Sequence, residues 1–158
     1  MDFRKMTEQD DQAIAELIRN NLRKYHLDIP GTVYFDKGLD HLFVYYNDPR
    51  RVYYVLEEDD SVIGGIGFAE FDGFDECCEL QKLYLRDDHK GKRIGYKMVQ
   101  YLEERAKKFG YCRIYLETHT NLEAAIHLYE KCGYREIERP VSVVHSSMNR
   151  FYLKEIGK

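Results

Sequence analysis

The sequence has 158 residues, with 24 basic and 28 acidic side chains that give a formal charge of −4 when the histidines are neutral. This length suits one domain, residues 1–158, with a core of its own. The 44% hydrophobic and 33% charged content is that of an ordinary globular protein. The acidic balance argues against a nucleic-acid partner, because general nucleic-acid-binding proteins normally present a basic surface.

Two kinds of targeting segment are absent from the sequence. Its start contains no apolar stretch typical of a signal peptide, and no apolar run approaches the roughly 18 residues that a membrane span needs. We therefore expect a cytoplasmic protein with no membrane partner. The four cysteines form no CxxC pair and no cysteine–histidine spacing suited to zinc, so reduced thiols and no metal are expected.

Hydrophobic periodicity divides the chain into strands and helices in a mixed order. A strand at 2–5 is followed by Thr7 and Asp10, spaced as in a capping box, and by a helix that ends near residue 25. A second, shorter helix is expected within 36–48. The later elements expected are strands at 51–58, 61–71 and 77–85, a helix at 94–109, a strand at 112–118, a helix at 121–132, and strands at 134–138 and 149–155.

This order predicts a mixed α/β fold. The helix at 94–109 connects the strands at 77–85 and 112–118, and a helical crossover of this kind favours a parallel pair. The segment GGIG, residues 64–67, is glycine-rich, but it lies inside a strand pattern with no helix behind it.

The segment before the helix at 94–109 combines small residues with positive charge. It contains Lys90, Gly91, Lys92, Arg93 and Gly95, with His89 directly before them. The first N–H groups of a helix have no intrahelical partner, so together with the helix dipole they form a natural anion site. The alternative is a solvated helix start that binds nothing. His89 is expected to be exposed to solvent.

The motifs of two common phosphate sites are missing. The sequence contains neither the nucleotide-binding loop GxxxxGK[ST] nor the dinucleotide fingerprint GxGxxG. The basic segment instead resembles the turn (Arg/Gln)-x-x-Gly-x-(Gly/Ala) of the GNAT superfamily of N-acetyltransferases. The segment KGKRIG departs from this pattern by Lys90 at the first position and by Arg93 at the usual glycine.

A second motif supports this resemblance. The segment NLEAAIHLYEKCGY resembles the superfamily's Asn-x-x-Ala…Tyr-x-x-x-Gly-(Phe/Tyr) pattern, with Asn121, Ala124, Tyr129, Gly133 and Tyr134 in register. The resemblance spans Glu79 to Tyr134. It implies a mixed, mostly antiparallel central sheet with one parallel central pair, flanked by about four helices. It also implies acetyl-CoA as the acyl donor, with its pyrophosphate held by the turn at 89–95.

The resemblance assigns the coenzyme to three parts of the chain. These are the strand before the turn, the turn with the helix start, and the segment before the next helix, which give Leu83, Tyr84, Leu85, Lys90, Gly91, Lys92, Arg93, Ile94, Gly95, Tyr96 and Asn121 as candidate binding residues. For Asn121 the alternative is that it only caps the helix that follows it.

Two candidate catalytic residues follow from the same resemblance. Tyr129 is at the position of the tyrosine that acts as the acid toward the thioester sulfur, although its apolar neighbours also fit a core residue. Glu79 is on the strand that carries a glutamate near the acceptor amine in many relatives, and is the candidate base; the alternative is a strand residue that faces solvent. Glu117 and His119 are the fallback candidates for the base.

The acceptor is expected to contact the segment 25–48, which overlies the acceptor site in the superfamily. This segment combines aspartates with several aromatic residues, which together could receive a cationic amine. A small primary amine or a peptide N-terminus is the expected acceptor. The alternative is a surface helix that packs on the sheet through its aromatics. Homodimers are common in the superfamily, often through the C-terminal strands.

The leading hypothesis is therefore an acetyl-CoA-dependent N-acetyltransferase that works by direct attack in a ternary complex. An alternative from another class is a coenzyme A-binding module without catalysis, which would keep the turn but not the acid and base. A general anion- or RNA-binding domain is a third alternative, opposed by the acidic total charge.

Overall fold

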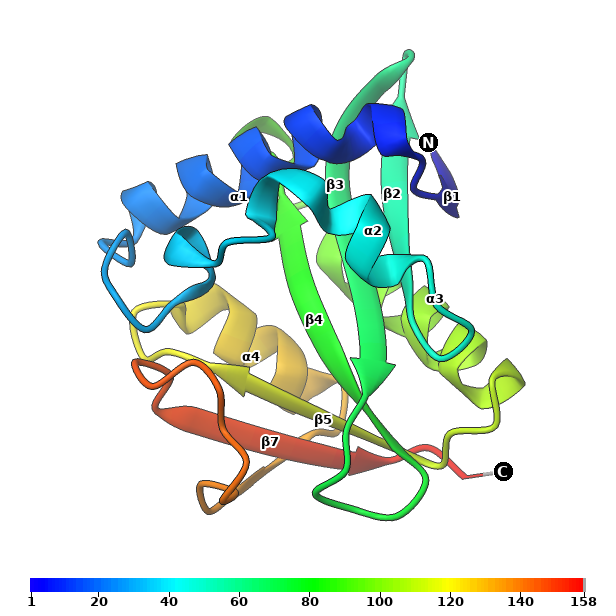
Figure 1. Cartoon of the computed structure of the whole chain (residues 1–158), viewed down its shortest axis with the longest axis vertical. Helices are drawn as coiled ribbons and strands as arrows, with labels where there is room; N and C mark the ends of the chain where they lie inside the picture. Colours follow the sequence, from blue (N-terminus) through cyan, green and yellow to red (C-terminus); the bar gives the residue numbers. More distant parts are fainter. Residues whose placement is uncertain (158) are drawn as a thin grey trace.

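The computed structural model describes residues 1–157, which form a seven-stranded sheet with helices on both faces (Figure 1). The strand order is β1-β2-β3-β4-β5-β7-β6. The strands are β1 (Asp2–Lys5), β2 (Val52–Glu58), β3 (Ser61–Glu70), β4 (Cys77–Leu85), β5 (Arg113–Thr118), β6 (Arg135–Ile137) and β7 (Arg150–Glu155). Only β4 and β5 pair in parallel among these neighbours. The mixed, mostly antiparallel sheet with one parallel pair is confirmed.

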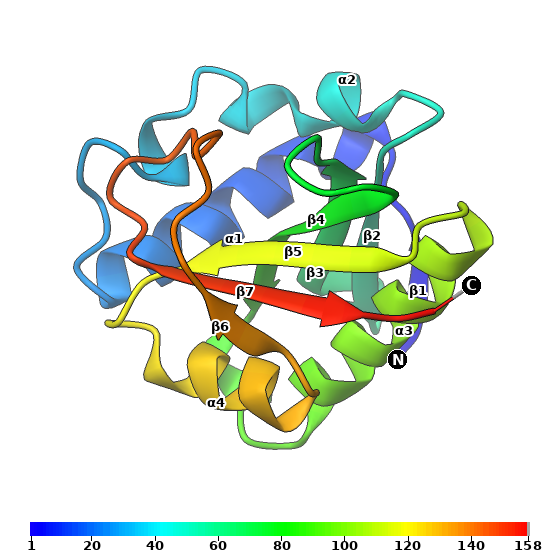
Figure 2. The ribbon, with the colours of Figure 1, turned by 90° about the horizontal axis from the view of Figure 1, so that it is seen from below.

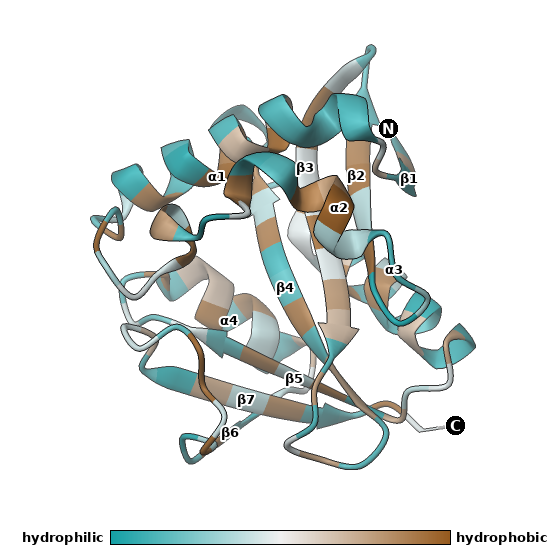
Figure 3. Cartoon of the chain, in the orientation of Figure 1, coloured by the Kyte–Doolittle hydropathy of each residue, from teal (hydrophilic) through white to brown (hydrophobic). Residues whose placement is uncertain are grey.

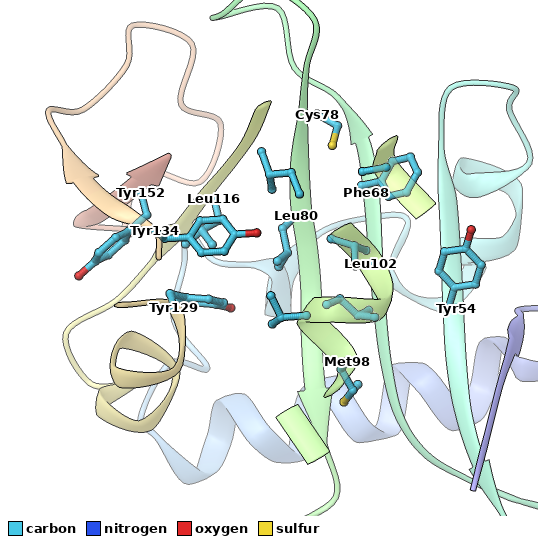
Figure 4. Packing of buried hydrophobic residues seen from close by; sticks show 14 of the residues in the cluster. Tyr54, Phe68, Cys78, Leu80, Met98, Leu102, Leu116, Tyr129, Tyr134 and Tyr152 are labelled. Carbon is cyan, nitrogen blue, oxygen red and sulfur yellow. The ribbon is translucent and has the colours of Figure 1, made fainter. Parts of the chain in front are cut away.

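Four α-helices cover the sheet in two layers (Figure 2). They are α1 (Asp11–Lys24), α2 (Leu42–Tyr46), α3 (Ile94–Lys108) and α4 (Glu123–Lys131). α1 and α2 lie on one face and share a core with Tyr53 and Val55 of β2. α3 and α4 lie on the other face, where the larger core forms (Figure 4). Figure 3 shows the mixed polar and apolar bands of α1, whose apolar residues face the sheet.

Two helix boundaries differ from the sequence-based expectation. The helix expected within 36–48 is α-helical only over Leu42–Tyr46, because His41 has a non-helical backbone that separates α2 from a 3₁₀ turn at Leu39–His41. The helix expected at 121–132 begins at Glu123, because the backbone of Leu122 is not helical. In both cases the local backbone ends a pattern that hydrophobic spacing alone would continue.

β4 and β5 diverge after a short stretch of pairing. Three residue pairs join them, and the last is Glu79 with Tyr115. Both strands continue beyond this point, β4 to Leu85 and β5 to Thr118. The sheet therefore opens between the carboxyl ends of its two parallel strands, and Figure 1 shows β4 and β5 running apart there.

A β-bulge in β4 lies beside this opening. β3 pairs with β4 through Gly67 and Gln81 and next through Gly65 and Tyr84, so β4 contains one extra residue between these pairs. Lys82 lies in the bulge with a left-handed backbone, φ 53°. A bulge changes the direction of the strand and of the side chains that it carries.

Tyr53 of β2 fixes the bulge across the intervening strand. Its hydroxyl donates a hydrogen bond to the Lys82 carbonyl at 2.7 Å. The ring can lie over β3 only because Gly65 and Gly67 have no side chain: a Cβ at Gly67 would lie 2.6 Å from the ring, and one at Gly65 would also overlap it. The glycine-rich segment 64–67 therefore makes room for an aromatic ring, inside a strand as the sequence predicts.

The Tyr53 hydroxyl can be tested by its removal. Tyr53→Phe leaves the Lys82 carbonyl without this donor, and we expect the free energy of unfolding to fall by about 1–3 kcal/mol. Urea unfolding of the wild type and the variant measures this loss. Tyr54→Phe is the matched control, because the Tyr54 hydroxyl makes no hydrogen bond within residues 1–157. Equal losses in the two variants would contradict the role of the Tyr53 hydroxyl.

Candidate active site

A cavity of about 380 Å³ occupies the opening between β4 and β5. Its walls come from α1, from β4 between Glu79 and Leu85, from the basic turn at 90–96, from the end of β5 and from α4. Most of the residues singled out from the sequence line it: Glu79, Leu83, Tyr84, Leu85, Lys90, Gly91, Arg93, Ile94, Gly95, Tyr96 and Tyr129. Lys92 and Asn121 do not line this cavity.

The basic turn has left-handed backbone at two positions. Gly91 has φ 81°, and Arg93 has φ 61° directly before Ile94, the first residue of α3. The usual glycine of the turn pattern corresponds to Arg93, and the backbone there is one that glycine adopts without strain. For arginine this conformation costs roughly 1–2 kcal/mol. The turn nevertheless contains the arginine in this conformation. Its guanidinium carbon lies 5.5 Å from the centre of the Tyr96 ring.

The three cations of the turn have different surroundings. Lys90 Nζ binds Asp87 at 2.8 Å and the Asn21 side-chain oxygen at 2.9 Å, so it ties the turn to α1. Neither Lys92 nor Arg93 has an ion-pair partner in the part of the chain that the structure describes. Their charges are available to an anion at the N-terminus of α3.

The prediction that His89 is exposed is wrong. The residue is buried, and its ring lies between two carboxylates, with Nδ1 at 2.8 Å from Asp88 and Nε2 at 3.2 Å from Glu58. The contacts with Asp88 and Glu58 raise the pKa of His89. Glu58 ends β2, so this histidine connects the turn to the β2–β3 hairpin. The sequence neighbourhood of His89 could not show a partner 31 residues away.

Tyr129 belongs both to the core and to the cavity wall. It is buried on α4, with its ring centre 6.0 Å from that of Tyr134. Its hydroxyl points from α4 toward β4 in Figure 4 and makes no hydrogen bond within residues 1–157. Burial raises the pKa of Tyr129, so the hydroxyl stays protonated at neutral pH and can donate a proton.

Glu79 lies on β4 at the point where the two parallel strands separate. Its Oε1 accepts a hydrogen bond from the Gln81 side-chain amide at 2.9 Å, and the Gln81 oxygen accepts one from the Tyr46 hydroxyl at 2.7 Å. Burial and the nearby Glu117 raise the pKa of Glu79 to about 7. Gln81 and Tyr46 therefore orient a carboxyl group that can gain or lose a proton near neutral pH.

The two fallback residues lie in different places. Glu117 lines the cavity and accepts a hydrogen bond from the Tyr115 hydroxyl at 2.9 Å. His119 Nδ1 instead accepts the backbone N–H of Asn121 at 3.0 Å. The Asn121 side chain donates to the Tyr25 carbonyl at 3.0 Å, and the residue before α4 is Leu122, so Asn121 is not the N-cap of that helix.

One functional candidate, His145, was not identified from the sequence. Its Nε2 lies 2.9 Å from Asp36 of the segment 25–48, and its Nδ1 lies 3.5 Å from Glu117. These two carboxylates raise the pKa of His145 to about 9. No sequence signal marks this histidine, because its partner Asp36 is 109 residues away.

Part of the segment 25–48 reaches the cavity. Tyr25, Leu27, Thr32 and Val33 line it, and the backbone of Gly31 accepts the Ser147 N–H at 3.1 Å, so the segment is joined to the loop that carries His145. The other aspartates with contacts are engaged elsewhere: Asp40 pairs with Arg19, and Asp48 with Arg50. Asp36 is thus the aspartate of this segment whose carboxylate lies near charged groups of the site, namely His145 and Lys82.

Two further features, a metal-binding cluster and a membrane-spanning helix, are absent from residues 1–157. No group of three or more His, Cys, Asp or Glu side chains is placed so that it could hold a metal ion. None of the described helices is both long enough and apolar enough to cross a membrane.

Comparisons with known proteins agree with the fold. The model of the acetyltransferase (GNAT) family matches residues 15–134. An uncharacterized N-acetyltransferase of Escherichia coli K12, YjgM, is 38% identical over 138 residues, which cover 86% of this chain and 83% of that protein. A GNAT acetyltransferase from Staphylococcus aureus Mu50 superposes with a TM-score of 0.87 at 19% identity, over 98% of each chain. PaiA N-acetyltransferase from Thermoplasma acidophilum, solved in complex with coenzyme A, gives 0.77 at 19% identity, also over 98% of each chain.

The raised pKa of Glu79 predicts a pH-dependent stability. The folded state holds the proton of Glu79 up to a pKa of about 7, against an ordinary value of 4.5, so between these pH values it binds more protons than the unfolded state. The free energy of unfolding therefore falls as pH rises through this window. Glu79→Gln removes the effect, and we expect the variant to gain about 2–3 kcal/mol relative to wild type between pH 5 and pH 8.

Denaturant unfolding of both proteins at pH 5 and pH 8 measures this difference. Glu104→Gln, on the exposed face of α3, is the control for loss of one carboxylate. The raised pKa would be contradicted if the difference between Glu79→Gln and wild type were the same at the two pH values.

Proposed function

The chain belongs to the acetyltransferase (GNAT) family and is an acyltransferase, and we propose that it transfers an acetyl group from acetyl-CoA to a primary amine. The observation that carries the proposal is the single cavity that runs from the basic turn, past Tyr129, to Glu79. It joins an anion site, a proton donor and a titratable carboxyl group. These are the groups that amide formation from a thioester and an amine requires.

The donor would bind with its pyrophosphate at the N-terminus of α3. Unpaired N–H groups at the helix start, together with Lys92 and Arg93, favour an anion there. Leu83, Tyr84 and Leu85 of β4 lie between this turn and Glu79 along the cavity wall, where the pantetheine arm would follow the strand. Two structural relatives, PaiA N-acetyltransferase and an aminoglycoside 6'-N-acetyltransferase, were solved with coenzyme A, which supports coenzyme A as the ligand of this fold.

Tyr129 is the proposed acid. In the reaction the amine nitrogen bonds to the carbonyl carbon and the carbon–sulfur bond breaks, so the leaving thiolate needs a proton. The protonated Tyr129 hydroxyl, which has no hydrogen-bond partner within residues 1–157, would supply it from the cavity wall. General acid catalysis of this kind typically contributes about 10²–10⁴-fold.

Glu79 is the proposed base, acting directly or through a water. The attacking nitrogen must lose a proton, and a carboxylate whose pKa is about 7 can accept it near neutral pH. Burial and Glu117, which raise this pKa, also make Glu79 a stronger base than an exposed glutamate. An acceptor that arrives as an ammonium loses two protons: Glu79 accepts them in turn and passes them on to solvent, while Tyr129 gives one proton to the thiolate and regains one from solvent, so one proton is released per turnover.

The acceptor is proposed to enter beside the segment 25–48. A small primary amine or a peptide N-terminus would bring its cationic group toward Glu79 and Glu117, both of which line the cavity. The alternative function is a coenzyme A-binding module without turnover. The pKa of Glu79 near 7 and the position of Tyr129 favour the enzyme, since a binding module needs neither.

Binding of the donor tests the turn. Acetyl-CoA titrated into the protein by calorimetry should bind in the micromolar range, with ATP as a control ligand. Arg93→Glu should weaken binding at least tenfold, since about 1.4 kcal/mol of lost interaction suffices for that. Lys108→Glu changes the net charge equally at the opposite end of α3 and should leave binding within about twofold.

Arg93→Gly separates charge from backbone geometry at the same position. It removes the guanidinium but keeps the left-handed backbone accessible. Binding unchanged in both Arg93 variants would exclude the turn as the phosphate site.

Removal of the Tyr129 hydroxyl tests catalysis separately from binding. Tyr129→Phe should lower kcat about 100-fold or more and leave the affinity for acetyl-CoA unchanged. The rate is followed as release of the coenzyme A thiol with an amine panel. Tyr111→Phe, whose hydroxyl contacts the Arg50 carbonyl outside the cavity, is the control. Full activity of Tyr129→Phe would assign the acid role to another group.

A further inference from the structure

Lys82 is a cationic residue that lines the cavity and interacts electrostatically with the proposed base, Glu79. It lies in the β4 bulge, three residues after Glu79, and both residues line the cavity. The side chain is partly buried, and burial lowers its pKa, while the nearby carboxylates Asp36 and Glu79 oppose this shift.

The Lys82 ammonium has no hydrogen bond and no ion pair among residues 1–157. Its Nζ lies 5.7 Å from the ring centre of Tyr45 and 5.8 Å from that of Tyr46, both on α2. Cation–π contacts of this length hold a cation weakly and satisfy none of its three N–H donors. Lys82 therefore keeps its hydrogen-bonding capacity for something in the cavity.

The other cationic side chain at this end of the cavity, His145, is already engaged, because it lies between Asp36 and Glu117. A partly buried ammonium without a contacting carboxylate is costly, because desolvation is not repaid by an ion pair. An anionic group on a bound molecule would supply the missing contact.

We propose that Lys82 binds a carboxylate of the acceptor, so that the substrate is an amino-acid-like compound carrying both an amine and a carboxylate. The inference rests on the proposed acetyl transfer, since it concerns the acceptor of that reaction. In this arrangement Glu79 contacts the amine of the acceptor and Lys82 contacts its carboxylate, both from the cavity wall that β4 forms. A single lysine matches one negative charge, whereas a phosphate dianion would call for several cations.

The first test compares matched acceptors. Each standard amino acid is offered together with its carboxamide, which keeps the amine and removes the negative charge. The wild type should acetylate one or more amino acids with a kcat/KM at least tenfold above that of the matching carboxamide. A charged hydrogen bond of the usual strength corresponds to roughly 10- to 100-fold.

Two variants separate the charge of Lys82 from its backbone. Lys82→Asn removes the cation and suits the left-handed backbone of the bulge. It should raise KM for the amino acid at least tenfold relative to KM for the matching carboxamide, while any change in kcat through the pKa of Glu79 affects both acceptors alike. Lys82→Arg keeps the charge and should retain the preference for the amino acid. If Lys82→Asn raised KM for the amino acid and for the carboxamide by the same factor, the inference would be overturned.

A binding measurement decides the inference independently of turnover. With coenzyme A present, calorimetry compares the N-acetyl forms of the standard amino acids with their carboxamides. Tighter binding of the acids, lost in Lys82→Asn, supports the inference; equal binding of acids and amides, or binding of neither, overturns it. Absence of acetylation with every amine would instead refute the proposed function, and the two failures are thereby distinguished.

Discussion

The arrangement of the site depends on one hydrogen bond, from the Tyr53 hydroxyl to the Lys82 carbonyl. It can form only because Gly65 and Gly67 leave β3 without side chains beneath the Tyr53 ring. The bond holds β4 in its bulged form, with one extra residue opposite β3. The residues before the bulge, Glu79 and Gln81, and those after it, up to Leu85, consequently line one continuous cavity.

Burial acts on the two proposed catalytic groups in the same direction and suits each to a different role. It raises the pKa of Tyr129 and thereby keeps a proton donor protonated, and it raises the pKa of Glu79 toward neutrality, where a carboxylate can accept a proton. Glu117 adds to the second effect by like-charge repulsion, while the hydrogen bond from Gln81 and the charges of Lys82 and His145 oppose it. Burial is the largest of these effects on the pKa of Glu79, and the neighbouring groups adjust it.

The fold could be predicted from the sequence to a large extent because its signals are local. Strand alternation, the helical crossover and the cations before α3 are all visible within short windows, and the parallel pair of β4 and β5 follows from the crossover. Apart from two helix ends, which local backbone conformation decides, what the sequence did not show concerns residues whose environment comes from distant segments. His89 is buried through Glu58, and His145 meets Asp36 across more than 100 residues. No local pattern contains such partners.

Both ends of the cavity have a non-glycine residue in a left-handed backbone, Lys82 in the bulge and Arg93 in the turn. Each conformation costs a side-chain-bearing residue roughly 1–2 kcal/mol that glycine would avoid. Both residues are cations without an ion-pair partner in the described chain, and both line the cavity. At both positions, therefore, a strained backbone carries a positive charge that has no ion-pair partner and lines the cavity. An anion at each end, the donor's pyrophosphate at Arg93 and the acceptor's carboxylate at Lys82, would offset the cost of both.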